Sequence, residues 1–106
     1  ILPSVPKNYF HSFYGYTILI KDLSKISRID LVNHLEKDGI ETRAFMGGDL
    51  TKQPAYRNEI FKVYGSLENT EIIEKSAFFI GCHPFINNNH INRIQKSFEA
   101  FFAKKH

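Results

Sequence analysis

The stretch TRAFMGGDLTKQPAY, residues 42–56, contains the only Gly-Gly pair of the chain. The pair follows residues 40–46 (IETRAFM), whose β-branched and apolar content predicts a strand. Pro54 suits the first turn of a helix, and Gly65 is placed to end that helix. Its apolar side would be formed by Ile60, Phe61, Val63 and Tyr64. The stretch therefore predicts a strand and a helix joined by a glycine-containing loop.

On the N-terminal side, residues 13–20 (FYGYTILI) form a continuous apolar run, which predicts a buried strand in a central position of the sheet. Ser27 is a good N-cap for the helix that follows. The buried stripe of that helix would be formed by Leu31, Val32 and Leu35. Gly39 is placed to end it.

On the C-terminal side, Asn69 or Thr70 is expected to cap a short helix that runs through Ile72 and Ile73. Residues 77–82 (AFFIGC) predict a third strand. Asn87 is expected to cap a last helix, whose apolar face recurs at Ile91, Ile94, Phe98 and Phe101 or Phe102. Lys104 and Lys105 would lie favourably at the negative end of its dipole.

The predicted order is β-α-β-(α-α)-β-α. We expect an α+β fold, a small sandwich in which a three-stranded sheet carries its helices mainly on one face. Residues 1–12 contain Pro3 and Pro6 without periodicity, which predicts an extended lead-in. Residues 13–106 would form the domain itself.

Composition excludes several classes of protein. The net charge of +3 is spread along the chain except at Lys104, Lys105 and His106, so no basic stripe indicates a nucleic-acid partner. Cys82 is the only cysteine, so neither an internal disulfide nor a cysteine-rich zinc or iron–sulfur site can be built from this segment alone. No apolar run approaches the length of a membrane span, and the N-terminus lacks a signal-peptide pattern. A cytoplasmic location is the default expectation.

Few residues suggest chemistry. Gly47-Gly48-Asp49 could let backbone N–H groups approach a phosphate, although a plain turn explains the pattern as well. Arg43 could present its guanidinium to a phosphate or carboxylate, or it could pair with Glu41. Lys52 and Gln53 could add a charge and an amide, or they could belong to a solvated loop.

Adjacent residues of a strand point to opposite faces, so Cys82 and His83 are not expected to form a nucleophilic pair. The sequence instead predicts that Cys82 is a small core residue and that His83 is a turn residue. It contains no spacing typical of a catalytic triad, a carboxylate pair or a metal site. We therefore predict no catalytic residue and no metal ligand in this chain.

Several segments, in order, resemble the C-terminal part of the DegT/DnrJ/EryC1/StrS family of pyridoxal-phosphate-dependent sugar enzymes. The segments are residues 12–16 (SFYGY), 30–36 (DLVNHLE), 39–43 (GIETR), 53–56 (QPAY), 67–70 (LENT) and 81–84 (GCHP). Residues 47–54 (GGDLTKQP) resemble the branch that acts as CDP-4-keto-6-deoxyglucose 3-dehydrase in lipopolysaccharide synthesis. The chain departs from this branch at Asp49, where asparagine is usual, and at Phe79, where tryptophan is usual.

The resemblance implies a homodimeric fold-type-I enzyme in which this small C-terminal domain closes over a site on a larger domain. Pyridoxal phosphate would be bound upstream, and any iron–sulfur ligands would also lie there. The resemblance implies that the nucleotide-sugar is contacted by Arg43, Gly47, Gly48, Asp49, Lys52, Gln53 and Tyr56. It implies a 3-dehydratase, with a sugar aminotransferase of the same family as the alternative. Apart from the resemblance, the residues also leave open a standalone anion-binding module. The fragment alone is expected to be inactive.

Overall fold

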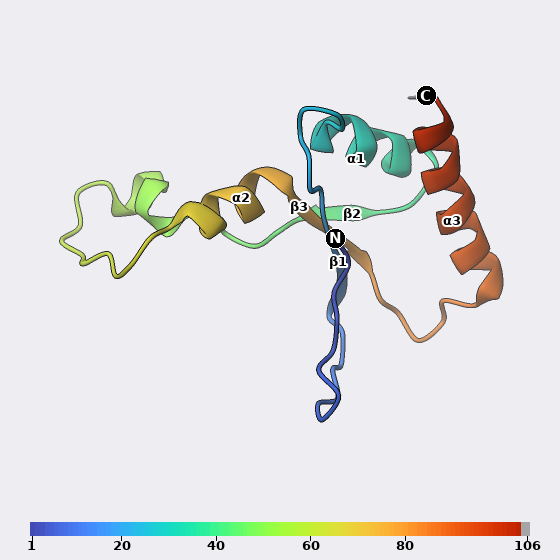
Figure 1. Ribbon diagram of the computed structural model, residues 1–106, viewed down its shortest axis with the longest axis horizontal. Helices are drawn as coiled ribbons and strands as arrows, with labels where there is room; N and C mark the ends of the chain where they lie inside the picture. The colour runs from blue at the N-terminus through green and yellow to red at the C-terminus, as the bar shows by residue number, and fades with distance from the viewer. Residues whose placement is uncertain (105–106) are drawn as a thin grey trace.

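The computed structural model describes residues 1–104, so Lys105, expected at the helix end, lies outside the described residues. The elements are β1 (Gly15–Leu19), α1 (Arg28–Lys37), β2 (Thr42–Ala44), the 3₁₀ turns η1 (Leu50–Lys52) and η2 (Pro54–Tyr56), α2 (Glu68–Ser76), β3 (Ala77–Gly81) and α3 (Asn88–Ala103) (Figure 1). Within residues 1–104, none of the helices has the length and apolar character that crossing a bilayer requires.

The three strands form one antiparallel sheet in the order β1-β3-β2. The central position predicted for the first strand is therefore wrong, because β3 is central and β1 lies at an edge. The apolar content of the sequence did not distinguish an edge strand from a central strand. The inner face of β1 enters the core, and Thr17 and Leu19 on its outer face are also half-buried. Part of this edge is covered by Ile1, which exchanges backbone hydrogen bonds of 2.8 and 3.0 Å with Leu19.

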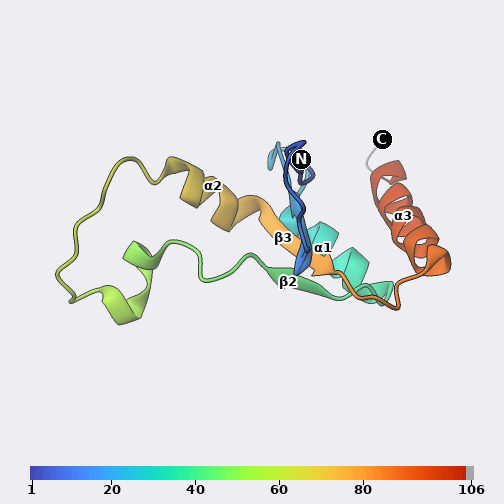
Figure 2. The same cartoon turned by 90° about the horizontal axis from the view of Figure 1, so that it is seen from below.

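The core lies between one face of the sheet and the helices α1 and α3 (Figures 1 and 2). Ile18 pairs with Phe78 across the ladder, so their side chains share this face, and both are buried. Leu31 and Leu35 from α1 and Phe101 from α3 complete the cluster. The structure thus confirms an α+β fold with a three-stranded sheet and helices mainly on one face.

Local caps begin two of the helices as predicted. The Ser27 hydroxyl accepts a 3.3 Å hydrogen bond from the backbone N–H of Asp30. Asn87 forms a full capping box with His90. Helix α2 is different, because it begins at Glu68 and neither Asn69 nor Thr70 caps it. The backbone N–H of Glu68 instead donates to the Ser66 hydroxyl at 3.3 Å, one turn earlier than expected.

The helix predicted from Pro54 to Gly65 is absent. Pro54 opens only the single turn η2, and the residues after it form a loop that projects away from the sheet (Figure 1). The apolar residues expected to be buried, Ile60, Phe61, Val63 and Tyr64, are all exposed. A helix this short is marginal in water without a surface to pack on, and the described chain offers these side chains none.

Candidate functional site

The glycine loop, residues 45–53, is held together by its own polar side chains. Asp49 is only 3% exposed, and its Oδ1 accepts hydrogen bonds from the Thr51 backbone N–H at 3.0 Å and from the Thr51 hydroxyl at 2.6 Å. The Gln53 amide Nε2 donates to the Gly47 carbonyl at 2.7 Å. The loop is therefore closed on itself by these hydrogen bonds.

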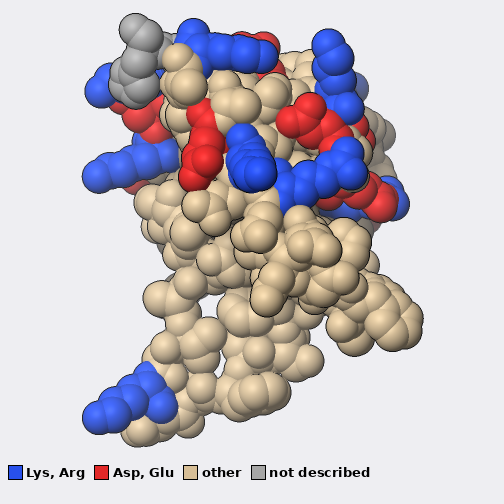
Figure 3. All heavy atoms as spheres, turned by 90° about the vertical axis from the view of Figure 1, so that its right-hand side faces the viewer, with Lys and Arg blue, Asp and Glu red and all other residues tan. Residues whose placement is uncertain are grey.

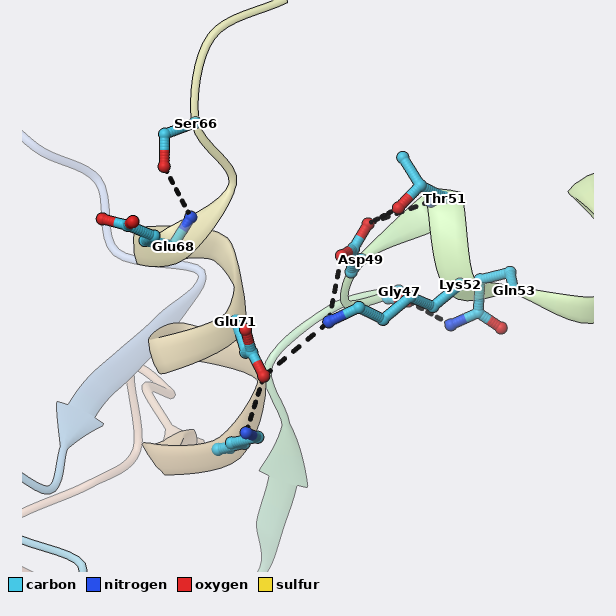
Figure 4. Close-up of polar contacts among 9 residues, drawn as sticks. Gly47, Asp49, Thr51, Lys52, Gln53, Ser66, Glu68 and Glu71 are labelled. Atoms are coloured by element: carbon cyan, nitrogen blue, oxygen red, sulfur yellow. Dashed lines mark hydrogen bonds and ion pairs between the residues drawn. The ribbon is translucent and has the colours of Figure 1, made fainter. Parts of the chain in front are cut away.

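Lys52 connects the glycine loop to helix α2 (Figure 4). Its Nζ lies 3.4 Å from Asp49 Oδ2 and 3.9 Å from Glu71 Oε1. The same Glu71 oxygen accepts from Lys75 Nζ at 2.7 Å. These ion pairs are exposed on at least one side, so each contributes modestly to stability, but together they fix the loop relative to the helix.

Backbone geometry shapes the other side of the loop. Gly48 has a φ of +67°, and a Cβ added there would come within 2.8 Å of Glu74 Oε1. Met46 has a φ of 47°, which is uncommon for a residue with a side chain. Beside them lies a mostly apolar hollow of about 350 Å³, lined by Phe45, Met46, Gly47, Gly48, Leu50, Thr70, Ile73 and Glu74.

Five of the seven predicted substrate contacts therefore lie in one ordered loop: Gly47, Gly48, Asp49, Lys52 and Gln53. The other two lie outside this loop, although the Tyr56 backbone N–H donates to the Gln53 carbonyl at 3.0 Å. Arg43, on β2, is 70% exposed at its side chain and pairs with Glu41 at 2.5 Å, one of the two partners anticipated for it. Tyr56 is 44% exposed in η2, at the base of the projecting loop.

The charge around the loop limits what it can bind. The carboxylates of Asp49, Glu71 and Glu74 outnumber the ammonium groups of Lys52 and Lys75. A surface with an excess of negative charge disfavours a multiply charged anion such as a diphosphate. Arg43 is then the better candidate for a phosphate group, because its ion-pair partner Glu41 is on the surface and can be exchanged.

The hydrogen bonds from Thr51 hold the pKa of the Asp49 carboxyl below its ordinary value of 3.8, and Lys52 adds to this effect. The hydrogen bond from Lys75 likewise lowers the pKa of Glu71. An acid with a lowered folded-state pKa stabilises the fold above its unfolded pKa, and this contribution is lost as the pH falls through the folded value. The loop is therefore expected to loosen in acid, below about pH 4.

We expect Asp49→Asn to reduce the acid sensitivity of the fold. Asparagine keeps an oxygen that can accept from Thr51 but removes the titrating charge. The fall in Tm between pH 7 and pH 3 should be smaller in this variant than in the wild type, while Glu59→Gln, at an exposed glutamate, should leave it unchanged. Thermal unfolding followed by circular dichroism measures both. An equal fall in all three proteins would contradict the prediction.

A second polar cluster joins α1 to α3 and contains serine, histidine and aspartate. The Ser97 hydroxyl donates to Asp38 Oδ2 at 2.6 Å, and His34 Nε2 lies 2.9 Å from the Ser97 carbonyl oxygen. The hydroxyl thus bonds directly to the carboxylate and not to the imidazole, which is the wrong order for activating a serine nucleophile. These contacts therefore stabilise the packing of α1 against α3.

The other predictions for reactive residues have mixed outcomes. Cys82 is exposed, so its prediction as a core residue is wrong; the strand ends at Gly81, before its side chain could turn inward. His83 is a turn residue as predicted, and its Nδ1 accepts from the Phe85 backbone N–H at 3.2 Å. Among residues 1–104, no group of three or more His, Cys, Asp or Glu side chains is placed to hold a metal ion.

Comparison with known families decides the lineage of the chain. Residues 2–99 match the model of the DegT/DnrJ/EryC1/StrS aminotransferase family. The chain belongs to this family. The resemblance seen in the glycine loop and its flanking segments is thereby confirmed over nearly the whole sequence.

Relatives of this DegT-family chain include sugar dehydratases. It is 34% identical over 102 residues to the lipopolysaccharide biosynthesis protein RfbH of Salmonella typhimurium, a match that covers 96% of this chain and 23% of RfbH. It is 31% identical over 104 residues to the dTDP-4-dehydro-2,6-dideoxy-D-glucose 3-dehydratase of Saccharopolyspora spinosa, covering 98% of this chain and 22% of that enzyme.

Solved structures agree with this placement. A mutant GDP-4-keto-6-deoxymannose-3-dehydratase (ColD) with bound GDP-perosamine superposes with a TM-score of 0.70 and 26% identity, over 78% of this chain and 22% of ColD. The E. coli enzyme with bound hydrated pyridoxal phosphate gives the same values. The DegT-family chain thus spans less than a quarter of the length of the relatives that it matches.

None of the lysines among residues 1–104 has the buried surroundings that commonly activate a Schiff-base lysine. A lysine that forms a Schiff base is activated by burial or by a neighbouring cation. Every lysine among residues 1–104 is exposed, and Lys25, Lys52 and Lys75 are paired with carboxylates.

Glu71 and Glu74 are the parts of the loop's surroundings that sequence reasoning did not find. The four-residue spacing of Glu71 and Lys75 on a predicted helix signals their mutual ion pair. No local signal relates Glu71 to Lys52, because a long irregular segment separates them.

Proposed function

We propose that this chain is the C-terminal domain, residues 13–106 with the lead-in 1–12, of a pyridoxal-phosphate-dependent nucleotide-sugar 3-dehydratase. Its substrate would be a CDP-4-keto-6-deoxyhexose used in lipopolysaccharide O-antigen synthesis. The observation that carries the proposal is the similarity along nearly the whole chain to RfbH and to a sugar 3-dehydratase. The alternative within the family is a sugar aminotransferase, as the family's name indicates.

The proposed role of the domain is to close over the substrate bound by the larger part of the enzyme. The glycine loop would contact sugar hydroxyl groups, because the carboxylates of Asp49, Glu71 and Glu74 beside it can accept hydrogen bonds from them. Arg43 would exchange its partner Glu41 for a phosphate oxygen of the nucleotide. Closure excludes water from the reacting centre, which protects reactive species from side reactions.

The proposal includes a homodimer and a cytoplasmic location, where the single exposed thiol of Cys82 would stay reduced. When bound to the larger domain, pyridoxal phosphate supplies the electron sink for carbon–hydrogen and carbon–oxygen bond cleavage. An iron–sulfur cluster in the full enzyme would need cysteines from outside this chain, since Cys82 is its only one.

The full-length enzyme containing Arg43→Ala is expected to bind the CDP-sugar roughly tenfold or more weakly, because one charge-assisted hydrogen bond is lost. Lys96→Ala, which removes one exposed positive charge from α3, is the matched control and should bind like the wild type. Calorimetric titration measures both. Equal affinity of Arg43→Ala and the wild type would remove Arg43 from the site.

Analysis of the product identifies the reaction. Loss of water from C3 of the sugar supports the 3-dehydratase, whereas an amino group gained at C4 supports the aminotransferase. Binding of free phosphate or oligonucleotide by the protein, with no CDP-sugar affinity, would favour a standalone anion-binding module.

A further inference from the structure

Two long runs of the chain contain no charged residue. Every Lys, Arg, Asp and Glu lies outside residues 8–20 (NYFHSFYGYTILI) and 76–92 (SAFFIGCHPFINNNHIN). The core strands account for only part of each run. The remaining parts, residues 8–14 and 82–92, lie outside the sheet and are mostly exposed.

The sheet brings these two segments to the same end of the molecule. Strands β1 and β3 are antiparallel, and Gly15 at the start of β1 pairs with Gly81 at the end of β3. Residues 8–14 therefore precede β1 at the same end of the ladder at which residues 82–92 follow β3. Both segments lie below the sheet in Figure 1. We call these two segments together the aromatic end.

Large rings are exposed to solvent across the aromatic end. The exposed fractions are 74% for Tyr9, 94% for Phe10, 79% for Tyr14 and 83% for Phe85. Figure 3 shows charged side chains crowded over the upper part of this view, whereas the lower part is almost free of them. Abundant aromatic residues and missing charges are the composition of the buried centre of a protein interface.

We infer that the aromatic end is the surface on which the larger domain of the full-length enzyme packs. This inference rests on the proposed function, which makes the chain one domain of a longer polypeptide. More than three quarters of each relative lies outside the region that it shares with this chain. That remainder is large enough to supply the covering surface.

The size and shape of the aromatic end fit such a partner. Burying four such rings removes roughly 500 Å² from solvent on this side, at about 150 Å² or less for each. Together with a similar area on the partner, this falls within the range of interfaces between domains, about 600–1,500 Å². The radius of gyration is 16.4 Å, against about 13 Å for a compact domain of this length, because the N-terminal segment and the loop after Pro54 both extend beyond the core.

The absence of charged residues from the aromatic end favours a domain of the same polypeptide over a separate protein or a membrane as its partner. Separate molecules gain encounter rate and register from complementary charges, whereas a domain on the same chain needs no such steering. A membrane surface would favour a cluster of basic residues around the rings, and Lys7 is the only charged residue that adjoins residues 8–14.

The test uses the full-length enzyme with Phe10→Glu and Phe85→Glu combined, which places two charges in the aromatic end. The matched control is Leu23→Glu with Ile29→Glu, at two exposed apolar residues outside it. Hydrogen–deuterium exchange of residues 8–14 and 82–92 should rise at least tenfold in the first variant and not in the control. Calorimetry should show the single unfolding transition of the wild type separating into two.

A second measurement needs no substitution. Hydroxyl-radical labelling of Tyr9 and Tyr14 should be at least fivefold lower in the full-length wild type than in its urea-unfolded form. Unprotected rings would overturn the inference. So would conversion of a wild-type dimer to monomers by the double variant, which would assign the surface to a second copy.

Binding of the wild type, but not the variant, to phosphatidylglycerol-containing vesicles would also overturn the inference, in favour of a membrane. The proposed function fails separately. Protected rings in a protein that does not convert the CDP-sugar would leave the docking surface in place and remove the dehydratase. Conversion of the CDP-sugar by a protein with unprotected rings would support the dehydratase and overturn the docking surface.

Discussion

Phe78→Ala is expected to lower the free energy of unfolding by roughly 3–5 kcal/mol. Phe78 is 1% exposed on the central strand β3, where it pairs with Ile18 and packs against the cluster under α1 and α3. Removing its ring leaves a cavity that close-packed neighbours can fill only in part. For a fold of this size, that is a large fraction of the total stability.

Phe85→Ala is the matched control, since Phe85 is 83% exposed in the loop after β3. It should change the free energy of unfolding by less than about 0.5 kcal/mol in the chain alone. Urea unfolding followed by circular dichroism measures both variants. If both lost equal stability, the core would not be centred on Phe78.

Gly48→Ala is expected to destabilise the glycine loop, while Gly47→Ala is not. At Gly48 the φ of +67° alone costs a residue with a side chain roughly 1–2 kcal/mol, and the new methyl group would also displace Glu74. At Gly47 the nearest atom to an added Cβ is Leu50 Cδ2 at 3.7 Å, which is ordinary contact. The two neighbouring substitutions therefore separate backbone strain from the loss of a glycine as such.

The two variants also test the role of the loop. In the full-length enzyme, Gly48→Ala should weaken CDP-sugar binding several-fold, because moving Glu74 deforms the hollow beside the loop. Gly47→Ala should bind within about twofold of the wild type, and its stability should change by less than about 1 kcal/mol. Equal affinities for both variants would show that the shape of the loop does not matter to the substrate.

Features decided by neighbouring residues were predictable from the sequence. Ser27 and Asn87 cap their helices because a cap needs only the next three residues, and Gly39 ends α1 with a φ of +76° for the same local reason. The fold class followed from the alternation of such elements. Membership of the family followed from several short segments in the right order, and the match over residues 2–99 confirms it.

Features decided by distant contacts were not predictable. An edge strand and a central strand can be equally apolar, so β1 was placed wrongly. The helix after Pro54 failed because its apolar face has nothing within the described chain to pack on. In the glycine loop, the Asp49–Thr51 turn is local, whereas the contact from Lys52 to Glu71 depends on how the projecting loop returns. The substrate contacts themselves stay a prediction.

The central position of β3 has a consequence for how the chain folds. The strand that pairs with both others is the last of the three to be synthesised, and β1 and β2 make no ladder with each other. No sheet can form until residues 77–81 have left the ribosome, and the β1–β3 ladder must then close a loop of nearly sixty residues. Pairing across such sequence distances slows folding. Until then α1 can form early, but its apolar stripe has no sheet to cover it.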